Sequence, residues 1–424
     1  MKEIVVVGGG PAGCMAAIEA AETFAGKGNV TLLEQNEKLG KKLYLTGKGR
    51  CNLTNGADIS EFYGKVNRNP KFLYSAFSGF TNEDVMRFFE GRGVYLKTER
   101  GNRVFPESDK SSDIIRALEG ALWDRRVDVR LRERVKDIGC FDGRVRFVRT
   151  EKRKLEADAV ILASGGLSYP TTGANGSGFT FAKALGHEIL DPVPSLVPLI
   201  TEETFVRELA GLTLKNVEIR LMEGKKERFR KFGELLFTHT GVSGPVILSA
   251  GSVLARDLAK GKRFSLVIDL KNALEEKQLS DRILRETKET PNVTVKTMMG
   301  RLLPKSLISY VLLQAEVSEE RAVHDLTKEE RLRLVHALKD FRLTVCGAAG
   351  FSEAIITCGG IRVKEIDPKT MESKKVRKLY FAGEMIDCDA ETGGYNLQIA
   401  WSTGYLAGRS AAEGLLQRKE TEYE

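Results

Sequence analysis

Cysteine is scarce in this chain of 424 residues, and none of its six cysteines forms a C-x-x-C pair: Cys14, Cys51, Cys140, Cys346, Cys358 and Cys388. This spacing argues against a zinc ribbon and a dithiol redox motif, and it is typical of reduced thiols in a cytosolic protein. No apolar run approaches about 18 residues, so no membrane-spanning helix is predicted. Because an apolar strand already begins at Ile4, no signal peptide is predicted either. We expect a cytoplasmic protein with no metal site and no membrane association.

Acidic residues are the minority among the charges: 58 Asp and Glu oppose 66 Lys and Arg, which gives a net charge of +8. Such a balance favours anionic partners, nucleic acid among them, although a dispersed basic surface without a partner is the commoner explanation. Residues 123–154 carry twelve Lys and Arg and only six Asp and Glu. A solvated sheet face explains their charge, and a strip facing ribosomal RNA is the sharper alternative. The composition predicts no oligomeric state.

The strongest motif lies in the first thirty-four residues. A β-branched run, Ile4 to Val7, reads as a buried parallel strand and leads directly into a glycine-rich turn and an alanine-rich helix. The turn, Gly8 to Gly13, fits G-x-G-x-x-G, with Gly8, Gly10 and Gly13 as the three glycines and Pro11 and Ala12 at the helix start. The first glycine permits the tight turn, the second lets a pyrophosphate approach, and the third lets helix and strand pack closely. The motif therefore predicts dinucleotide binding.

A second apolar run, Val30 to Leu33, ends in Glu34. A carboxylate about 20 residues past the glycines can accept hydrogen bonds from a ribose 2′-hydroxyl. An acid here argues for FAD or NAD and against NADP. Glu34 as a solvated charge at a strand end is the structural alternative.

The segment from Lys41 to Asn55 is polar and rich in glycine, and it follows the ribose-binding acid. We expect backbone donors near Gly49, together with Arg50 and Asn52, to bind phosphate or the edge of a flavin. A plain surface loop is the alternative. Cys51 is the cysteine with the best case for chemistry, because neighbouring Arg50 and Lys48 favour its thiolate, although a structural thiol is at least as good an explanation.

Two later segments return the chain to the same sheet. Ala157 to Gly166 is a buried strand that ends in small residues, and Ser164 and Gly165 would let backbone pass close to the dinucleotide. Near the C-terminus, a strand from Lys378 leads into Gly383, Glu384 and Asp387. A glycine pair then opens a helix, with Gly393, Gly394, Tyr395, Asn396 and Leu397 at its start. We expect Asp387 to meet a ribityl chain and the helix start to stabilise negative charge on a reduced flavin.

The chain is too long for one hydrophobic core, so several domains are expected. We place a Rossmann-type FAD-binding domain at residues 1–190 and 355–424, an inserted β-rich domain at 191–272 with a return strand at 339–354, and a helical subdomain at 273–338. Within the β-rich part, the turn from Thr238 to Pro245 holds His239, a candidate general acid or substrate contact. Hydrogen-bonded turn histidines without catalytic roles are common.

Seven segments together resemble a bacterial family of FAD-dependent oxidoreductases, the aminoacetone oxidase or bile-acid enone reductase type: Gly8–Gly13, Gly49–Asn55, Ala163–Gly166, Phe237–Pro245, Thr357–Ile361, Phe381–Asp387 and Gly393–Gln398. The resemblance covers nearly the whole chain. It implies an α/β fold of the glutathione-reductase type, with FAD held by both ends of the chain and β-rich and helical parts inserted between them. Activities implied for the family are reduction of conjugated steroid enones, oxidation of aminoacetone, and dihydrouridine formation in large-subunit ribosomal RNA.

The residues of the chain favour some of these activities over others. A second glycine fingerprint is absent, so NAD(P)H would act as a transient reductant without a Rossmann domain of its own. An enone and the uracil C5=C6 bond are both conjugated to a carbonyl, so one site can reduce either, with Cys51 and His239 as candidate proton donors. We therefore predict an NAD(P)H-driven reductase of a conjugated double bond. The alternatives are a flavin oxidase of a small amine and an RNA-binding flavoprotein with structural FAD.

Overall fold

The computed structural model describes residues 1–417 and divides the chain into two compact units. The first unit combines the two ends of the chain, Met1–Ser195 and the residues from Gly350 onward, and the second is Leu196–Ala349. The boundary expected at residue 191 therefore falls inside a strand of the first unit, and residues 350–354 also belong to that unit. The β-rich and helical parts together make the second unit.

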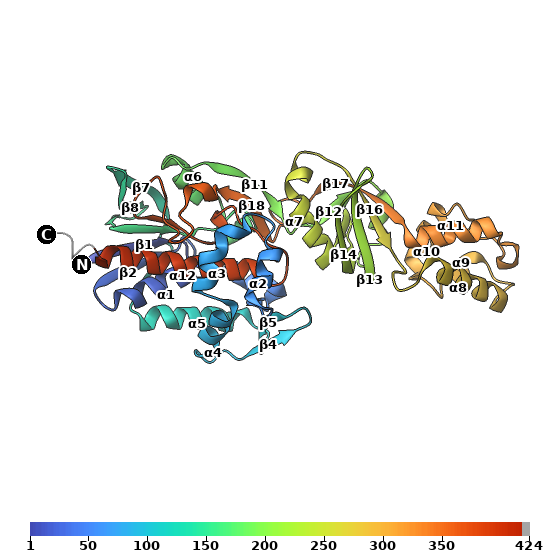
Figure 1. Ribbon diagram of the computed structural model, residues 1–424, viewed down its shortest axis with the longest axis horizontal. Coiled ribbons are helices and arrows are strands. Elements are labelled where there is room, and N and C mark those ends of the chain that lie inside the picture. Colours follow the sequence, from blue (N-terminus) through green and yellow to red (C-terminus); the bar gives the residue numbers. More distant parts are fainter. Residues whose placement is uncertain (418–424) are drawn as a thin grey trace. The chain divides into compact units, whose positions relative to one another are not determined.

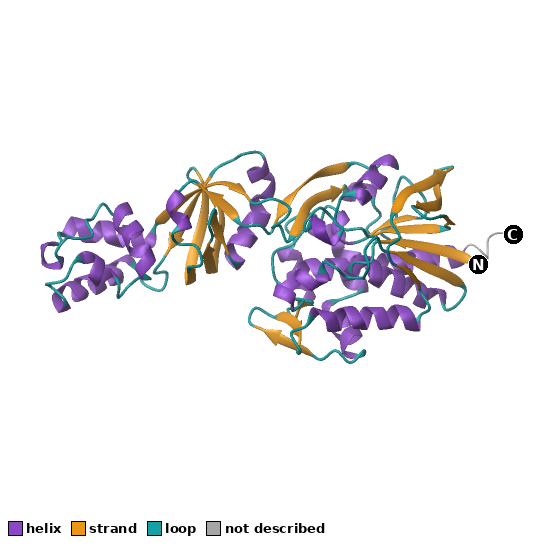
Figure 2. Ribbon diagram, turned by 180° about the vertical axis from the view of Figure 1, so that it is seen from behind, coloured by secondary structure: helices purple, strands orange, loops and turns teal. Residues whose placement is uncertain are grey.

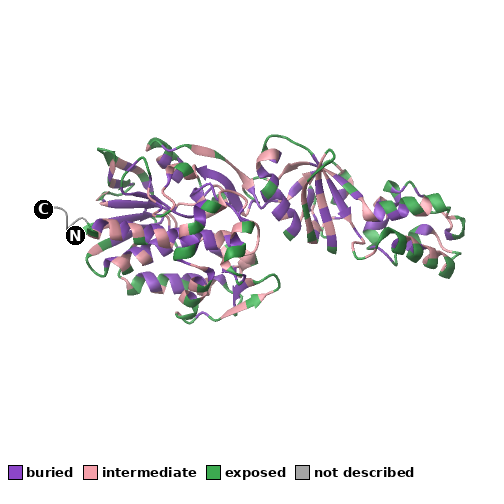
Figure 3. Cartoon of the chain, viewed as in Figure 1, coloured by how far each residue is buried: buried purple, intermediate pink, exposed green. Residues whose placement is uncertain are grey.

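A five-stranded parallel sheet forms the centre of the first unit, in the order β19-β10-β1-β2-β6. Its strands are β1 (Lys2–Val7), β2 (Gly28–Leu33), β6 (Asp128–Arg130), β10 (Ala159–Leu162) and β19 (Leu379–Phe381). Most of their side chains are buried, as Figure 3 shows, which is why these strands read as continuous apolar runs. The carboxyl ends of β1, β10 and β19 are neighbours, although β19 lies more than 370 residues after β1.

Two helices from opposite ends of the chain pack against each other, α1 (Pro11–Phe24) and α12 (Tyr395–Leu416), as Figure 1 shows. Their backbones are in contact at two glycines of α12. A Cβ on Gly404 would lie 2.3 Å from the carbonyl oxygen of Ala12, and one on Gly408 would lie 2.2 Å from that of Ala16. Small residues at this spacing let the helices approach closely and bring the C-terminal segment to the start of α1.

The rest of the first unit surrounds this framework. Its helices are α2 (Ile59–Phe62), α3 (Tyr74–Gly79), α4 (Asn82–Glu90), α5 (Ser111–Asp124) and α6 (Ser177–Ala184). Its smaller sheets are β3-β5-β4 (Thr54–Asn55, Arg103–Pro106, Leu96–Glu99), β7-β8-β9 (Val135–Phe141, Arg144–Thr150, Lys154–Glu156) and β11-β18 (Ile189–Ser195, Ile356–Ile361). Asp142 and Gly143, a pair typical of tight hairpin turns, both have positive φ and join β7 to β8.

The second unit contains a closed barrel in the order β12-β15-β14-β13-β16-β17. Its strands are β12 (Leu199–Thr201), β13 (Thr213–Glu223), β14 (Lys226–Phe237), β15 (Gly241–Ser243), β16 (Phe264–Asp269) and β17 (Phe341–Ala348). Four helices gather at one end of the barrel in Figure 2: α8 (Glu276–Glu289), α9 (Val295–Met299), α10 (Lys305–Gln314) and α11 (Lys328–Lys339). They share one apolar core with it.

One long helix of the second unit, α7 (Pro245–Ala259), was not predicted. Its sequence contains Gly, Ser and Val, which are weak helix formers, although the buried residues Val246, Ala250, Leu254 and Leu258 recur every four positions. In residues 1–417, no helix is long and apolar enough to cross a membrane.

Candidate functional site

The glycine turn has the geometry of a phosphate cradle. It leads from β1 into α1, and a Cβ on Gly13 would lie 1.8 Å from the carbonyl oxygen of Gly8, so only glycine lets helix and strand pack this closely. A Cβ on Gly10 would meet no atom within 4 Å, which shows open space beside the turn. Pro11 takes the first helical position, and the first-turn N–H groups, including that of Ala12, have no intrahelical acceptor. An anion can approach these donors.

Glu34 follows β2 directly and is 8% exposed. Its carboxylate accepts hydrogen bonds from the N–H of Gly9 at 2.8 Å and from the backbone and side-chain nitrogens of Asn36 at 2.8 and 2.7 Å. These bonds fix the carboxylate beside the glycine turn. Since two carboxylate oxygens offer about four acceptor positions, one ribose hydroxyl can still be bound.

Four segments that are remote in sequence meet at the carboxyl ends of β10 and β19. Lys42 Nζ lies 2.6 Å from both Ser168 Oγ and Glu384 Oε2. Glu384 Oε1 accepts hydrogen bonds from Ser168 Oγ and from the N–H of Thr357, each at 2.8 Å. Burial alone would raise the pKa of Glu384, but the Lys42 ammonium and these hydrogen bonds outweigh it, and the pKa is lowered. The predicted site residue Glu384 is therefore an ionised carboxylate in a network that sequence reasoning missed.

Of the two residues expected after β10, only one faces open space. Ser164 lies against Gly178 of α6, where a Cβ would come within 2.0 Å of its hydroxyl, and its Oγ lies 3.6 Å from Met385 Sδ. Gly165 has a positive φ, and a Cβ there would meet no atom within 4 Å. A ligand can therefore approach the backbone at Gly165.

The C-terminal half of the expected site is in contact with the first helix. A Cβ on Gly383 would lie 2.7 Å from Ala12 Cβ, so this turn reaches the start of α1. Asp387 is 4% exposed, and its carboxylate accepts a hydrogen bond from Asn69 Nδ2 at 3.2 Å. Next to it, Arg68 forms an ion pair with buried Asp389. The loop at residues 67–69, which sequence reasoning also missed, thus holds the segment expected to meet the ribityl chain.

Side chains around the glycine pair hold the backbone in place. A Cβ on Gly394 would lie 2.3 Å from the carbonyl oxygen of Thr54. With its amide oriented to satisfy its neighbours, Asn52 accepts a hydrogen bond from the N–H of Gly394 at 3.0 Å. Asn396 exchanges hydrogen bonds with the backbone of Ala390 at 2.9 and 2.8 Å.

The side chains of Tyr395 and Leu397 take part in packing. The ring of Tyr395 packs edge-on against Phe62, and Leu397 is half-buried against the core. Direct cofactor contacts by residues 393–397 remain a prediction. The backbone at the start of α12 is more available for such contacts than these side chains.

Of the two explanations left open for Cys51, its surroundings favour the structural thiol over the thiolate. Its side chain is fully buried, and burial raises the pKa of the thiol to about 12. Arg50, whose charge was expected to lower this pKa, lies over the ring of Phe105 and pairs with Glu99 at 2.8 Å. Arg50 and Gly49 are therefore beside the β4–β5 hairpin, and their predicted cofactor contacts stay a prediction.

His239 lies exposed in the turn between β14 and β15. It belongs to the second unit, whereas every predicted cofactor residue belongs to the first. Its catalytic role stays a prediction.

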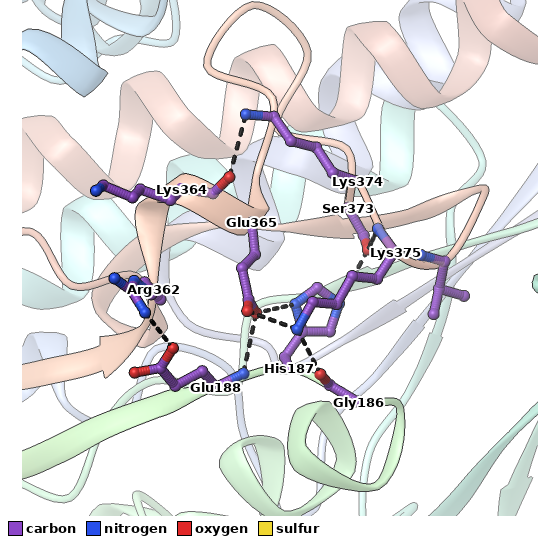
Figure 4. A network of polar contacts seen from close by, with 10 residues as sticks. Gly186, His187, Glu188, Arg362, Lys364, Glu365, Ser373, Lys374 and Lys375 are labelled. Carbon is purple, nitrogen blue, oxygen red and sulfur yellow. Dashed lines mark hydrogen bonds and ion pairs between the residues drawn. The ribbon is translucent and has the colours of Figure 1, made fainter.

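Outside this site, a serine, a histidine and a glutamate are in contact in the order found in the catalytic triad of a serine hydrolase (Figure 4). Ser373 Oγ lies 2.9 Å from His187 Nε2, and His187 Nδ1 lies 3.2 Å from Glu365 Oε2. However, Ser373 Oγ already accepts the N–H groups of Lys375 and Val376 at 3.0 and 2.8 Å, and it is 7% exposed. The hydroxyl therefore donates to a neutral His187, and the cluster holds the loop before β19 rather than forming a nucleophile.

The parallel sheet, the glycine turn and the acid after β2 define a dinucleotide-binding protein of the Rossmann type. The chain belongs to the family described as HI0933-like protein Rossmann domain, whose model matches residues 2–410. It is an FAD-dependent oxidoreductase. The open space at Gly10 and Gly165 and the free amides of α1 fit this cofactor.

Relatives match along nearly the whole chain. The 3-dehydro-bile acid delta(4,6)-reductase of Clostridium scindens is 33% identical and covers 97% of this chain and 100% of its own. The ribosomal RNA dihydrouridine synthase of Haemophilus influenzae is 32% identical and covers 96% of this chain and 98% of its own. Among solved structures, 3-ketosteroid delta1-dehydrogenase from Sterolibacterium denitrificans shares the fold, with a TM-score of 0.50, 12% identity, and coverage of 98% and 100%.

Proposed function

We propose that this protein reduces a carbon–carbon double bond conjugated to a carbonyl, with NAD(P)H as the reductant. One observation carries the proposal: two relatives of nearly equal identity span the whole chain and are named for unrelated molecules, a bile acid and ribosomal RNA. A delta(4,6)-reduction of a 3-dehydro bile acid and the conversion of uridine to dihydrouridine both saturate a double bond next to a carbonyl. The shared chain therefore favours the shared chemistry.

When bound, FAD supplies a two-electron carrier that takes a hydride from one partner and gives it to another. The residues of the first unit bind and orient it: the turn from Gly8 to Gly13 and the first-turn amides of α1 for the diphosphate, and Glu34 for the ribose. Asp387, fixed by Asn69, serves the ribityl chain. The N-terminus of α12 at Gly394 would offer the positive end of a helix dipole to negative charge on a reduced flavin.

The remaining proton must come from an acid that can reach the substrate. Cys51 is protonated at neutral pH but is fully buried and a weak acid, which counts against it. His239 is exposed, lies in the second unit, and is the other candidate, which the variant below tests. A small-molecule enone is the first substrate to test, because the bile-acid reductase spans nearly the whole chain. Uridine in ribosomal RNA is the second substrate to test.

The proposal is tested by spectroscopy on the FAD-loaded protein under anaerobic conditions. NADH or NADPH should bleach the flavin absorbance, and a 3-keto-4-ene steroid or unmodified ribosomal RNA should restore it. His239→Gln should slow the restoration but not the bleaching. Failure of both nicotinamides to bleach a loaded protein would overturn the reductase assignment. Rapid peroxide formation with aminoacetone in air, without nicotinamide, would select an amine oxidase instead.

A further inference from the structure

The backbone near Lys42 is held against the glycine turn from Gly8 to Gly13. Lys42 lies two residues after Gly40, whose N–H donates to the carbonyl oxygen of Gly9 at 2.8 Å. Its ammonium reaches Ser168, which follows β10, and Glu384, which follows β19. Since β10 neighbours β1 in the sheet, this places the ammonium in the crevice outside the carboxyl ends of the strands, where α/β folds bind their ligands.

Within this network, Lys42 has one N–H donor that the other residues do not use. A lysine ammonium has three N–H donors, and two of them are directed at Ser168 and Glu384. The Glu384 carboxylate, by contrast, already accepts three hydrogen bonds. The Lys42 side chain is 22% exposed, and neither of its two hydrogen bonds uses the third N–H.

The space beside this donor suits an extended anionic group. A Cβ on Gly10 or Gly165 would meet no atom within 4 Å, so the backbone on both sides of the β1–β10 boundary is open to a ligand. The first-turn amides of α1 follow Gly10 directly in the chain and have no intrahelical acceptor. A diphosphate held by these amides has a second face, which needs a donor of its own.

We propose that Lys42 provides that donor and binds the FAD diphosphate through its third N–H. The inference rests on the FAD assignment and adds to it a residue from the loop after Glu34. Glu384 holds the ammonium in place and cancels its net charge. The contact is thus one oriented hydrogen bond to a phosphate oxygen rather than a long-range attraction, and its strength depends little on salt.

The test separates a cofactor contact from a purely structural ion pair. Lys42→Met keeps the length of the side chain but removes the donor, and it also leaves the half-buried Glu384 carboxylate without its cation. The double variant Lys42→Met/Glu384→Gln removes that unpaired charge. Lys41→Met is the matched control, because Lys41 lies on the same loop and its ammonium contacts Glu37 Oε2 and Asn36 Oδ1, each at 3.4 Å, rather than Ser168 or Glu384. For each full-length protein stripped of FAD, we would measure the melting temperature and the dissociation constants of FAD and ADP by fluorescence titration.

We expect Lys42→Met to weaken FAD and ADP by a similar factor, about tenfold or more, since a hydrogen bond to a charged group is lost. The double variant should recover the melting temperature but not the affinity, and Lys41→Met should match the wild type. If the double variant recovers both properties, the ion pair is only structural and the proposal is overturned. If FAD weakens while ADP does not, the contact is to the flavin part and the diphosphate assignment is overturned. If the wild-type protein binds no FAD, the cofactor assignment itself fails, a result visible without any variant.

Discussion

Arg68 and Asp389 form a buried ion pair, with 2.7 Å between Nη1 and Oδ1, and the side chain of Asp389 is 2% exposed. Asn67 joins the pair: its Nδ2 lies 3.5 Å from Asp389 Oδ2, and its N–H donates to the Asp389 carbonyl. Burial raises the pKa of Asp389, even though the Arg68 cation acts to lower it. The pair therefore joins the loop at residues 67–69 to the segment that carries Asp387, and holds that segment in place.

Arg68→Met should destabilise the protein by about 3 to 5 kcal/mol at pH 7, because it leaves an uncompensated carboxylate in the interior. Asp389 has a folded-state pKa above its unfolded value of 3.8, so its ionisation costs stability as the pH rises through that window. Without Arg68 this cost increases, and the deficit of the variant should shrink as the pH falls toward 4. Urea unfolding at pH 4.5 and pH 7 measures both effects. The double variant Arg68→Met/Asp389→Asn should recover much of the loss, and an equal deficit at both pH values would contradict the charge argument.

Gly404→Ala should destabilise the contact between α1 and α12. The new Cβ would lie 2.3 Å from the carbonyl oxygen of Ala12, and backbone atoms on two packed helices cannot move aside easily. We expect a loss of about 1 to 3 kcal/mol and weaker FAD binding, because Ala12 belongs to the first turn of α1. Gly120→Ala in α5 is the control, since a Cβ there meets no atom within 4 Å. It should be neutral or stabilise the protein by up to about 1 kcal/mol. Thermal unfolding of both variants makes the comparison.

Local features of the fold and site were readable from the sequence because their parts lie close together along the chain. The glycine turn and Glu34 all fall within thirty-four residues, and strand, turn and helix each have a local pattern. The fold class was therefore predictable, including the return of β10 and β19 to the first sheet. The role of each individual side chain in the candidate site was not predictable.

Contacts between distant residues left no such pattern. Lys42 and Glu384 are 342 residues apart, and Arg68 and Asp389 are 321 apart. Each looks like an ordinary surface charge until the fold brings its partner to it. The neighbours of Cys51 in the sequence also do not define its environment. Arg50 turns away toward Glu99, on a hairpin nearly fifty residues later. Adjacent residues share a backbone but need not share an environment.

His187 should make the stability of the protein depend on pH. Burial lowers its pKa from 6.5, against the opposing effect of Glu365, while Lys375 lowers it further and Ser373 donates a hydrogen bond to the neutral ring (Figure 4). A histidine with a lowered folded-state pKa contributes full stability above 6.5, and that stability is lost as the pH falls below this value. The free energy of unfolding should therefore decrease between pH 7.5 and pH 5.5. In His187→Gln the decrease over this interval should be smaller, whereas an unchanged pH profile would show that His187 does not carry it.

Cys51 should resist alkylation in the folded protein, although the sequence suggested a reactive thiolate. Its thiol is fully buried with a pKa raised to about 12, so neither access nor ionisation favours attack at pH 8. Cys140 is exposed on β7 and should be modified first. Brief treatment with iodoacetamide followed by peptide mass spectrometry distinguishes the two sites, and labelling in denaturant gives the fully accessible reference. Modification of Cys51 at a rate close to that of Cys140 would mean that the loop around Gly49 opens readily, and it would remove the objection from burial to Cys51 as a proton donor.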